Sequence, residues 1–314
     1  MKRILLISTR YFDYPEKIKR EFISNGMKCD LVYETPIFYK FLKQLGLKRV
    51  CDYFYFVYVN LFYFLVKNKD YYNEVVIIRC ENISNKLLSK ISSFNGRKTL
   101  YEWDSYNNLS RFEEISSFCD RVLTFDLNDA KNFDIQYKSL FFSKEYYSSK
   151  GQDKLYDVCF VGSWHKDRNL IVNSFKKECE QKKLVFHAHL YMSFLLYLKL
   201  FILRKDRPKF NEVTFRSLSD KDILTLYHSS KYILDIHSAT QSGFTMRTFE
   251  ALAAGCCLIT TNNSVLKSNF FDSCFLLSRE SCHLDMTELN QLNPVNEAFL
   301  KEYSLKNWVL TLFD

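Results

Sequence analysis

Short apolar runs alternate with segments of helical periodicity along the whole chain, and this alternation constrains the fold more than any other feature. Short apolar runs bounded by turn residues are typical of buried strands. Strands that alternate with helices favour parallel sheets covered by helices on both faces, so the sequence predicts an α/β protein. The expected strands are 3–7, 28–33, 74–79, 99–103, 121–125, 135–142, 157–161, 184–190, 213–215, 232–236, 256–261 and 274–277.

The alternation of strands and helices restarts after a polar segment in the middle of the chain. Residues 143–154 (SKEYYSSKGQDK) contain no apolar run, which is typical of a domain boundary. At 314 residues the chain is long enough for two domains of ordinary size. We therefore expect a first domain over 1–148 and a second over 149–314. The final segment, 294–313, has a helical pattern.

The stretch 235–262, DIHSATQSGFTMRTFEALAAGCCLITTN, contains a strand end, a polar loop and a short predicted helix. We expect Thr245 to cap the amino end of this helix and Gly255 to end it. Amide groups at a helix start bind anions, and Arg247 in the first turn adds a positive charge. Glu250 lies one turn further, where its carboxylate can accept hydrogen bonds from sugar hydroxyls. The stretch therefore predicts a nucleotide site.

The same stretch resembles the nucleotide-sugar site of GT-B glycosyltransferases. The large retaining family of that fold carries a Glu, seven residues and a second Glu ahead of A-x-A-x-G. Glu250 takes the place of the second Glu, which by resemblance holds the donor ribose, and Ala251, Ala253 and Gly255 follow it. Ser242 stands where the first Glu would be. More narrowly, SGFTMRTFEALAAG resembles bacterial glycosyltransferases of capsule and lipopolysaccharide synthesis.

The resemblance implies a GT-B fold, with two Rossmann-like domains that face one another across a cleft. The second domain would bind the nucleotide-sugar donor, and the first would bind the acceptor. The last helix of such proteins often packs back on the first domain. The segment VGSWHKDR resembles the first loop of the nucleotide domain, and its cations can bind a diphosphate without a metal or other cofactor. The residues expected to bind the donor are Gly162, Ser163, Lys166, Arg168, Ser242, Gly243, Phe244, Thr245, Arg247 and Glu250.

A catalytic base for the acceptor hydroxyl is expected at the carboxyl end of a parallel strand. Asp104 in YEWDS is the first candidate, followed by Asp126 in TFDLND and by His237. A strand-end Asp is more often a helix cap or turn residue, and for Asp104 this structural interpretation is favoured. For Glu250 and for the cations of VGSWHKDR, the alternative is a solvated surface position.

The net charge and the cysteine content indicate which partners and which cellular compartment suit the protein. The net charge of +8 suits an anionic nucleotide or phospholipid surface, and no nucleic-acid-binding motif accompanies it. The ten cysteines form no C-x-x-C pair, which favours thiols in a reducing cytoplasm. The seven glycines form neither G-x-G-x-x-G nor G-x-x-x-x-G-K, which disfavours dinucleotide dehydrogenases and P-loop NTPases.

Two apolar segments bear on membrane contact. Residues 53–66 and 190–203 are too short to span a bilayer, and basic residues flank them. Aromatic residues beside Lys and Arg suit a helix that lies on an anionic leaflet. The alternative is a buried core helix. It is favoured as much as membrane contact for the first segment and at least as much for the second. We therefore expect a cytoplasmic protein, with peripheral contact to the inner face of the membrane as an open option.

These observations predict a metal-independent glycosyltransferase that moves a sugar from a nucleotide-sugar donor to a glycan or lipid-linked acceptor in bacterial surface polysaccharide synthesis. Two alternatives stay open. One is a GT-B epimerase that acts on the nucleotide sugar itself with water. The other is a non-catalytic protein that binds a nucleotide or glycolipid within a membrane assembly. This alternative rests on Ser242, which stands where the family pattern has its first Glu.

Overall fold

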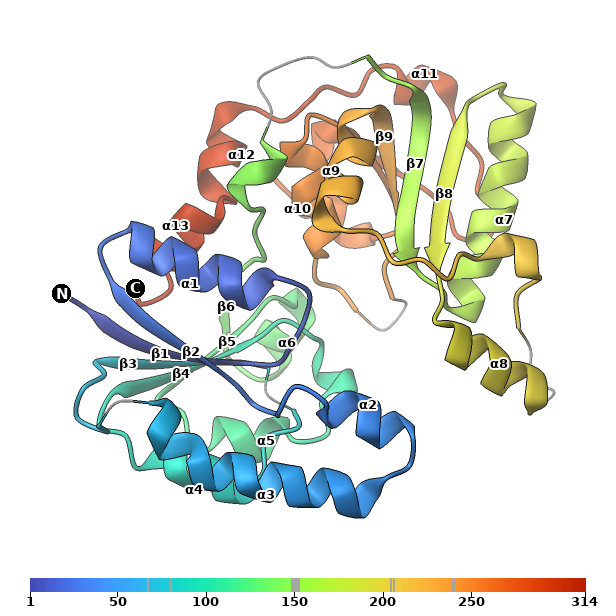
Figure 1. Ribbon diagram of the computed structural model, residues 1–314. Helices are drawn as coiled ribbons and strands as arrows, with labels where there is room; N and C mark the ends of the chain where they lie inside the picture. Colours follow the sequence, from blue (N-terminus) through green and yellow to red (C-terminus); the bar gives the residue numbers. More distant parts are fainter. Residues whose placement is uncertain (67, 80, 148–152, 204, 206, 239–240) are drawn as a thin grey trace. The chain divides into compact units, whose positions relative to one another are not determined.

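The computed structural model contains two parallel β-sheets with helices on both faces of each (Figure 1). It describes residues 1–314 except 67, 80, 148–152, 204, 206, 239 and 240. The chain divides into a first unit of Met1–Leu140 with Leu305–Asp314 and a second unit of Phe141–Ser304. The expected boundary between residues 148 and 149 lies outside the described residues.

The first unit has a doubly wound sheet of six parallel strands in the order β2-β1-β3-β4-β5-β6. The chain adds β2 on one side of β1 and then crosses to add β3 on the other side. Right-handed crossovers therefore place α1 on one face and α4 on the other. Its elements are β1 (Arg3–Ser8), α1 (Tyr14–Ser24), β2 (Lys28–Tyr33), α2 (Tyr39–Gln44), α3 (Lys48–Leu65), β3 (Glu74–Ile78), α4 (Asn85–Ser92), β4 (Arg97–Glu102), η1 (Tyr106–Asn108), α5 (Phe112–Ser116), β5 (Arg121–Thr124), α6 (Leu127–Asn132), β6 (Gln136–Tyr137) and α13 (Leu305–Leu310).

Helix α3, which contains most of the first apolar segment, is part of the core of the first unit. Val59 and Phe62 are 1% and 0% exposed and pack with side chains of the sheet, α4 and α5. Tyr53, Phe54 and Phe56 lie on the opposite, exposed side of the helix. One stripe of α3 is thus buried, as expected for a helix that packs on a sheet.

The second unit has a doubly wound sheet of five parallel strands in the order β11-β10-β9-β7-β8. Its core includes Ile171, Val172 and Phe175 of α7 on one face, and α9 and α10 cover the other face (Figure 1). Its elements are η2 (Lys144–Tyr146), β7 (Tyr156–Ser163), α7 (Lys166–Gln181), β8 (Phe186–Tyr191), α8 (Phe194–Ile202), η3 (Phe210–Glu212), α9 (Asp220–His228), β9 (Ser230–Asp235), α10 (Met246–Ala253), β10 (Cys257–Thr260), η4 (Asn263–Lys267), η5 (Phe271–Ser273), β11 (Cys274–Leu276), α11 (Met286–Leu289) and α12 (Glu297–Glu302).

Several helix ends follow directly from local sequence. Pro15 lies in the first turn of α1, where its missing N–H removes no helical hydrogen bond. Ser219 and Asp222 form the expected capping box of α9. Gly255 follows α10 with a φ of 76°, in the left-handed region that glycine adopts without strain. These three predictions are confirmed.

Two predicted elements are wrong in detail. Residues 213–215 form no strand, because only Thr214 pairs with the sheet, through a single bridge to Tyr191 of the edge strand β8. The segment 294–313 forms two short helices, α12 and α13, because the backbone around Ser304 pairs with Phe142 instead of continuing the helix. In the first unit, α13 packs against α1.

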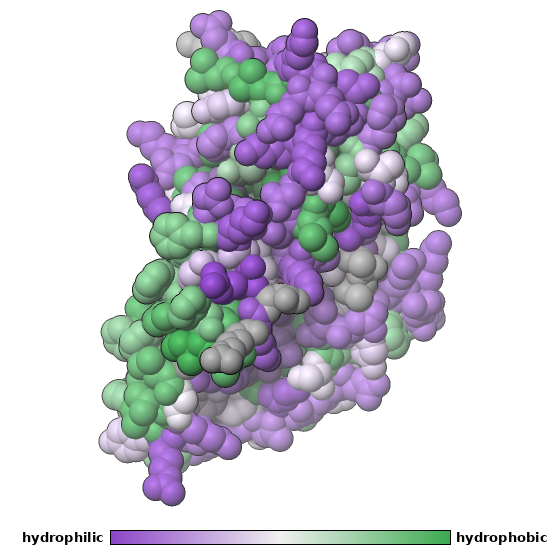
Figure 2. Space-filling view, turned by 90° about the vertical axis from the view of Figure 1, so that its right-hand side faces the viewer, coloured by the Kyte–Doolittle hydropathy of each residue, from purple (hydrophilic) through white to green (hydrophobic). Residues whose placement is uncertain are grey.

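The second apolar segment ends β8 and then forms α8, and the interpretation of this segment as a core helix is wrong. No residue of α8 is buried. Figure 2 views the side of the molecule on which α8 lies in Figure 1, and it shows a broad hydrophobic area there.

Candidate functional site

Two loops leave the second sheet in opposite directions at the boundary between β7 and β9. The chain goes from β7 through α7 to β8, whereas it goes from β9 through α10 to β10 on the other side. In doubly wound sheets, ligands bind at such a switch point. Arg168 joins the two loops, since its Nη1 donates to the Ser163 carbonyl at 2.7 Å and its Nη2 donates to the Ile236 carbonyl at 3.3 Å. The residues that follow β7 and β9 thus lie together.

A buried ion pair lies beneath these loops. Arg247 Nη1 is 2.7 Å from Oδ1 of Asp235, whose side chain ends β9 and is 1% exposed. Arg247 Nε also donates to the Val161 carbonyl at 2.9 Å. Because a buried carboxylate needs a partner, Arg247 acts as its counter-charge and braces α10 against β7. Part of the Arg247 guanidinium is thus engaged with protein acceptors, and its predicted contact with the donor phosphate stays a prediction.

The same carboxylate organises the start of α10. Thr245 Oγ1 donates to Asp235 Oδ1 at 3.2 Å, and Thr248 Oγ1 donates to Asp235 Oδ2 at 3.0 Å. Thr245 Oγ1 also accepts from the Thr248 amide at 3.4 Å, so the predicted cap is confirmed. The amide groups of the first turn of α10 are therefore held in a fixed direction at the carboxyl edge of the sheet.

Asn262 fastens the loop that leads into α10. Its Nδ2 donates to the carbonyls of Ser242 and Gly243, both at 3.2 Å, and its side chain is 3% exposed. Ser264 Oγ also donates to the Ser242 carbonyl, at 2.8 Å. Residues 239 and 240 of this loop lie outside the described residues. Asn262 was not predicted as a site residue, yet it positions two residues that were.

Two predicted donor-binding side chains are buried in the second unit. Phe244 is 7% exposed, and its ring packs 5.0 Å from that of Phe270. Its side chain thus packs in an aromatic core, and its predicted contact with the donor stays a prediction. Glu250 is 4% exposed, so its interpretation as a solvated residue is wrong. Burial raises the pKa of the Tyr227 hydroxyl, and the nearby Glu250 carboxylate raises it further. The ribose role of Glu250 stays a prediction.

Basic side chains gather around the end of β9. Arg279 donates to the His237 carbonyl, and His237 Nδ1 lies 2.9 Å from Thr261 Oγ1. Burial lowers the pKa of the His237 imidazole, Arg279 and Arg168 lower it further, and Asp235 acts in the opposite direction. Burial and the positive charge at this edge therefore favour the neutral form of the imidazole.

Arg279 is a candidate site residue that sequence analysis missed. It follows the end of β11 and meets His237 from a position 42 residues away in the sequence. Its Nη1 also lies 3.7 Å from Asp167 in the first turn of α7. The rule that selected His237, a polar side chain just past a parallel strand, would have found Arg279 as well.

Gly162 allows close packing under the loop after β7. A Cβ at this position would lie 2.9 Å from Cζ of Phe160 and 3.2 Å from Nη2 of Arg247. Only glycine fits without a shift of the buried Phe160 ring. Ser163, the last residue of β7, and Lys166, the first residue of α7, are exposed. Their predicted contact with a donor stays a prediction.

The two predicted Asp bases lie in the first unit and have structural partners. Asp104 Oδ2 is 2.9 Å from Nη2 of Arg79, and its Oδ1 accepts from Asn108 Nδ2 at 2.8 Å. Asp126 caps α6 and accepts from Ser105 Oγ at 2.7 Å. These contacts match the cap-and-turn interpretation that sequence analysis favoured for Asp104. A catalytic role for either stays a prediction.

Glu102 ends β4 in an unusual environment. It is 2% exposed, and its Oε2 has no hydrogen-bond partner in the described part of the chain. Burial raises the pKa of this carboxyl well above its ordinary value, against the effect of Arg79, and the nearby Asp104, Glu81 and Glu34 raise it further. Burial therefore favours the protonated form of Glu102.

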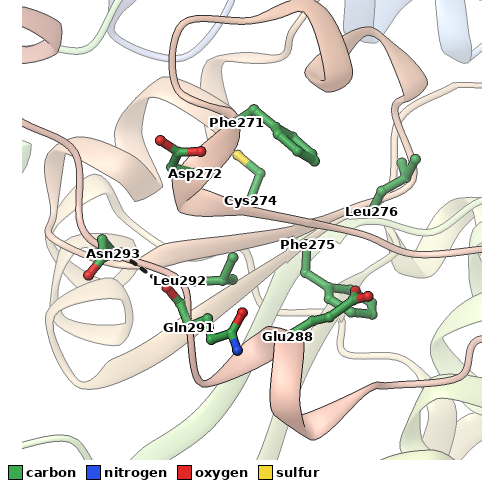
Figure 3. A pocket seen from close by; sticks show the side chains of 9 residues that line it. All are labelled: Phe271, Asp272, Cys274, Phe275, Leu276, Glu288, Gln291, Leu292 and Asn293. Atoms are coloured by element: carbon green, nitrogen blue, oxygen red, sulfur yellow. Dashed lines mark hydrogen bonds between the residues drawn. The ribbon is translucent and has the colours of Figure 1, made fainter.

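An open pocket of about 440 Å³ lies beside the edge strand β11, two strands away from β9 (Figure 3). The side chains of Asp272 and Glu288 contribute carboxylates to its lining. Negative charge disfavours a nucleotide diphosphate, so this pocket is a poor candidate for the donor site. Within the described ranges, no three His, Cys, Asp or Glu side chains are placed to hold a metal ion.

Comparisons with known proteins add evidence on the fold. A family model described as glycosyl transferase-like matches residues 177–289. No curated protein matches the sequence. Among solved structures, UDP-GlcNAc 2-epimerase from Methanocaldococcus jannaschii is similar, with a TM-score of 0.54 and 12% identity over 99% of each chain.

Two further structures are similar over almost the full length. UDP-GlcNAc 2-epimerase from Neisseria meningitidis, bound to UDP-GlcNAc, has a TM-score of 0.51 and 11% identity over 99% of this chain and 98% of its own. The glycosyltransferase of kitacinnamycin has a TM-score of 0.51 and 9% identity over 99% of this chain and 97% of its own. Such low identities establish the fold alone. The predicted fold is therefore confirmed: the chain has the GT-B fold of two Rossmann-like domains.

Proposed function

We propose that the chain is a glycosyltransferase that binds a nucleotide-sugar donor at the switch point between β7 and β9. The observation that carries this proposal is the group of Arg168, Arg279 and His237 at the carboxyl edge of the second sheet. A diphosphate is the ligand that suits fixed guanidinium groups beside helix amino ends. The glycosyl transferase-like match over residues 177–289 supports the same assignment.

The reaction would form a bond between an acceptor oxygen and the anomeric carbon of the sugar and break the bond from that carbon to the diphosphate. The proton of the acceptor hydroxyl passes to a base, and the nucleoside diphosphate leaves with the bonding electron pair. Arg168 and Arg279 would stabilise the negative charge that develops on the leaving group. His237 is a candidate base, and its Nε2 is the relevant nitrogen because Nδ1 is engaged with Thr261.

The donor class in this proposal is a UDP-sugar, and the acceptor is a glycan or lipid-linked sugar. One structural neighbour is named as bound to UDP-GlcNAc, and another as a complex with UDP, which supports a uridine nucleotide. A role in bacterial surface polysaccharide synthesis rests on the resemblance of the segment around Glu250. The nine described cysteines are free thiols, and eight of them are buried, which supports a reducing cytoplasm as the site of the reaction.

An epimerase that acts on the nucleotide sugar is the second candidate. It is favoured by the similarity to UDP-GlcNAc 2-epimerases over 99% of the chain. An epimerase would need no acceptor, so the two candidates differ in their products.

The test is incubation of the full chain with UDP-, GDP-, dTDP- and CMP-sugars, with and without glycan and lipid-linked acceptors, followed by mass spectrometry and sugar analysis. We expect nucleoside diphosphate release together with a sugar joined to the acceptor. An epimerised sugar without any acceptor product would replace the proposal by the second candidate. Nucleotide binding without turnover in any combination would contradict both and favour a non-catalytic role.

A further inference from the structure

Helix α8 exposes an apolar surface that the rest of the second unit does not cover. Seven of its nine side chains are exposed, and the other two are only half-buried. Ile202, Leu195 and Phe201 are 68%, 59% and 54% exposed. Large apolar patches on a protein surface mark sites that contact another molecule or a membrane.

Helix α8 differs from the apolar helix α3 in having no buried residue, although α3 also exposes Tyr53 and Phe54. Helix α3 buries Val59 and Phe62 completely in the core of its own unit. The two segments, 53–66 and 190–203, have similar sequences, since both are aromatic, apolar and flanked by basic residues. One side of α3 therefore packs in a core, whereas α8 buries none of its residues.

Helix α8 is nevertheless fixed to the second unit at its base. Ser193 caps its amino end by accepting from the Leu196 amide at 3.2 Å. The rings of Phe194 and Tyr197 lie 5.5 Å and 5.4 Å from the ring of Phe215. The outward apolar surface is thus carried on a defined helix.

Basic residues border this surface. Residues 194–210 contain five basic residues and one acidic residue. Arg207 donates to the Tyr197 hydroxyl at 2.8 Å, and its guanidinium lies 4.7 Å from the Phe201 ring centre. An open hollow of about 530 Å³ is lined by Phe201, Ile202, Lys205 and Arg207. Cations next to exposed apolar side chains match a phospholipid, in which a phosphate lies next to acyl chains.

We propose that α8 docks the protein on an anionic phospholipid leaflet, with the helix axis in the plane of the interface. Phe201, Ile202 and their apolar neighbours would enter the boundary between headgroups and acyl chains. Lys205 and Arg207 would bind lipid phosphates. A helix of nine residues is about 14 Å long, well under the roughly 30 Å of a bilayer core. In the described part of the chain no helix is long and apolar enough to cross a membrane. This proposal does not depend on the glycosyltransferase activity.

The test is sedimentation of the full chain with vesicles of phosphatidylcholine alone or with phosphatidylglycerol, without any nucleotide sugar. We expect binding to the anionic vesicles that weakens as salt increases. The double variant Phe201→Ser with Ile202→Ser should bind at least tenfold more weakly, because both side chains lose their burial in the lipid. Arg207→Gln should weaken binding to anionic vesicles about fivefold.

The matched control is the double variant Tyr53→Ser with Phe54→Ser on the exposed side of α3, which should bind like the wild type. All four substituted apolar positions are exposed, at 54% and 68% on α8 and 65% and 51% on α3, so the fold should be kept. An unchanged thermal unfolding midpoint checks this. Equal affinity of the α8 variant and the wild type would overturn the proposal. So would a dimer of the wild-type chain that dissociates in the α8 variant while vesicle binding is absent, since a second copy would then cover α8.

Discussion

Asp235→Asn tests the ion pair beneath the candidate site, and we expect it to lower the free energy of unfolding of the second unit by about 3–5 kcal/mol. Asp235 is 1% exposed and Arg247 is 16% exposed, with 2.7 Å between Oδ1 and Nη1. The neutral Asn keeps the shape of the side chain but leaves a largely buried guanidinium without its counter-charge. The magnitude thus reflects an uncompensated charge in addition to a lost hydrogen bond.

The assay is urea unfolding of the wild type, Asp235→Asn, Arg247→Gln and the double variant. Because the double variant leaves neither charge unpaired, we expect a coupling of about 1–3 kcal/mol between the two changes. The ion pair of Lys231 with Asp157 is a matched control, since its distance is also 2.7 Å but Lys231 is 53% exposed. Lys231→Gln should lower the free energy of unfolding by less than about 1 kcal/mol. Equal effects at the two pairs would refute the role given to burial.

Three further predictions concern single residues. Gly162→Ala should lower the free energy of unfolding by about 1–3 kcal/mol, because its new methyl group would meet the Phe160 ring and displace Arg247; chemical denaturation measures this. Asn262→Ala should lower it by about 1–3 kcal/mol and weaken nucleotide binding, because it releases two loop carbonyls; denaturation and calorimetry measure these effects. Because burial raises the folded-state pKa of Glu102, wild-type stability should fall as pH rises above the ordinary Glu pKa, by up to about 1.4 kcal/mol per pH unit. Glu102→Gln should remove this part of the pH dependence, which urea unfolding at several pH values measures.

Each of these predictions has an outcome that contradicts it. Ser163→Ala, next to Gly162 and exposed, should stay within about 0.5 kcal/mol of the wild type, and an equal effect at both positions would argue against the close contact. Asn293→Ala is the control for Asn262→Ala, because Asn293 Nδ2 makes an exposed bond within its own loop. An equal loss of unfolding free energy in the two variants would contradict the role given to Asn262. If Glu102→Gln keeps the full pH dependence, another group is responsible for it.

The fold could be predicted from the sequence because its signals are local. Apolar runs mark the strands, and the Ser219 to Asp222 capping box and Gly255 mark helix ends through contacts within a few residues. The predictions of a strand over 213–215 and of one helix over 294–313 failed, because a single long-range contact decides the structure in each. Thr214 makes a single bridge to β8, and Ser304 pairs with Phe142 across the sequence, and neither contact has a local signal.

The candidate site could be predicted only in outline. The rule for strand ends selected the loops around Arg168 and His237, which the structure brings together. It could not show that Arg247 pairs with Asp235 or that Phe244 packs on Phe270, because these depend on burial in the folded unit. Burial also distinguishes α8, which has no buried residue, from α3, which buries Val59 and Phe62, although the two sequences are alike in composition.

The most direct test of the central claim is calorimetric titration of the full chain with UDP. Arg168→Gln and Arg279→Gln are compared with the control Arg216→Gln, whose Arg side chain is 82% exposed in the same unit. We predict that each site variant weakens UDP binding by roughly 10- to 100-fold, as expected for a charge-assisted contact to phosphate, and that Arg216→Gln binds like the wild type. Equal UDP affinity in all four proteins would contradict the donor site at the switch point between β7 and β9.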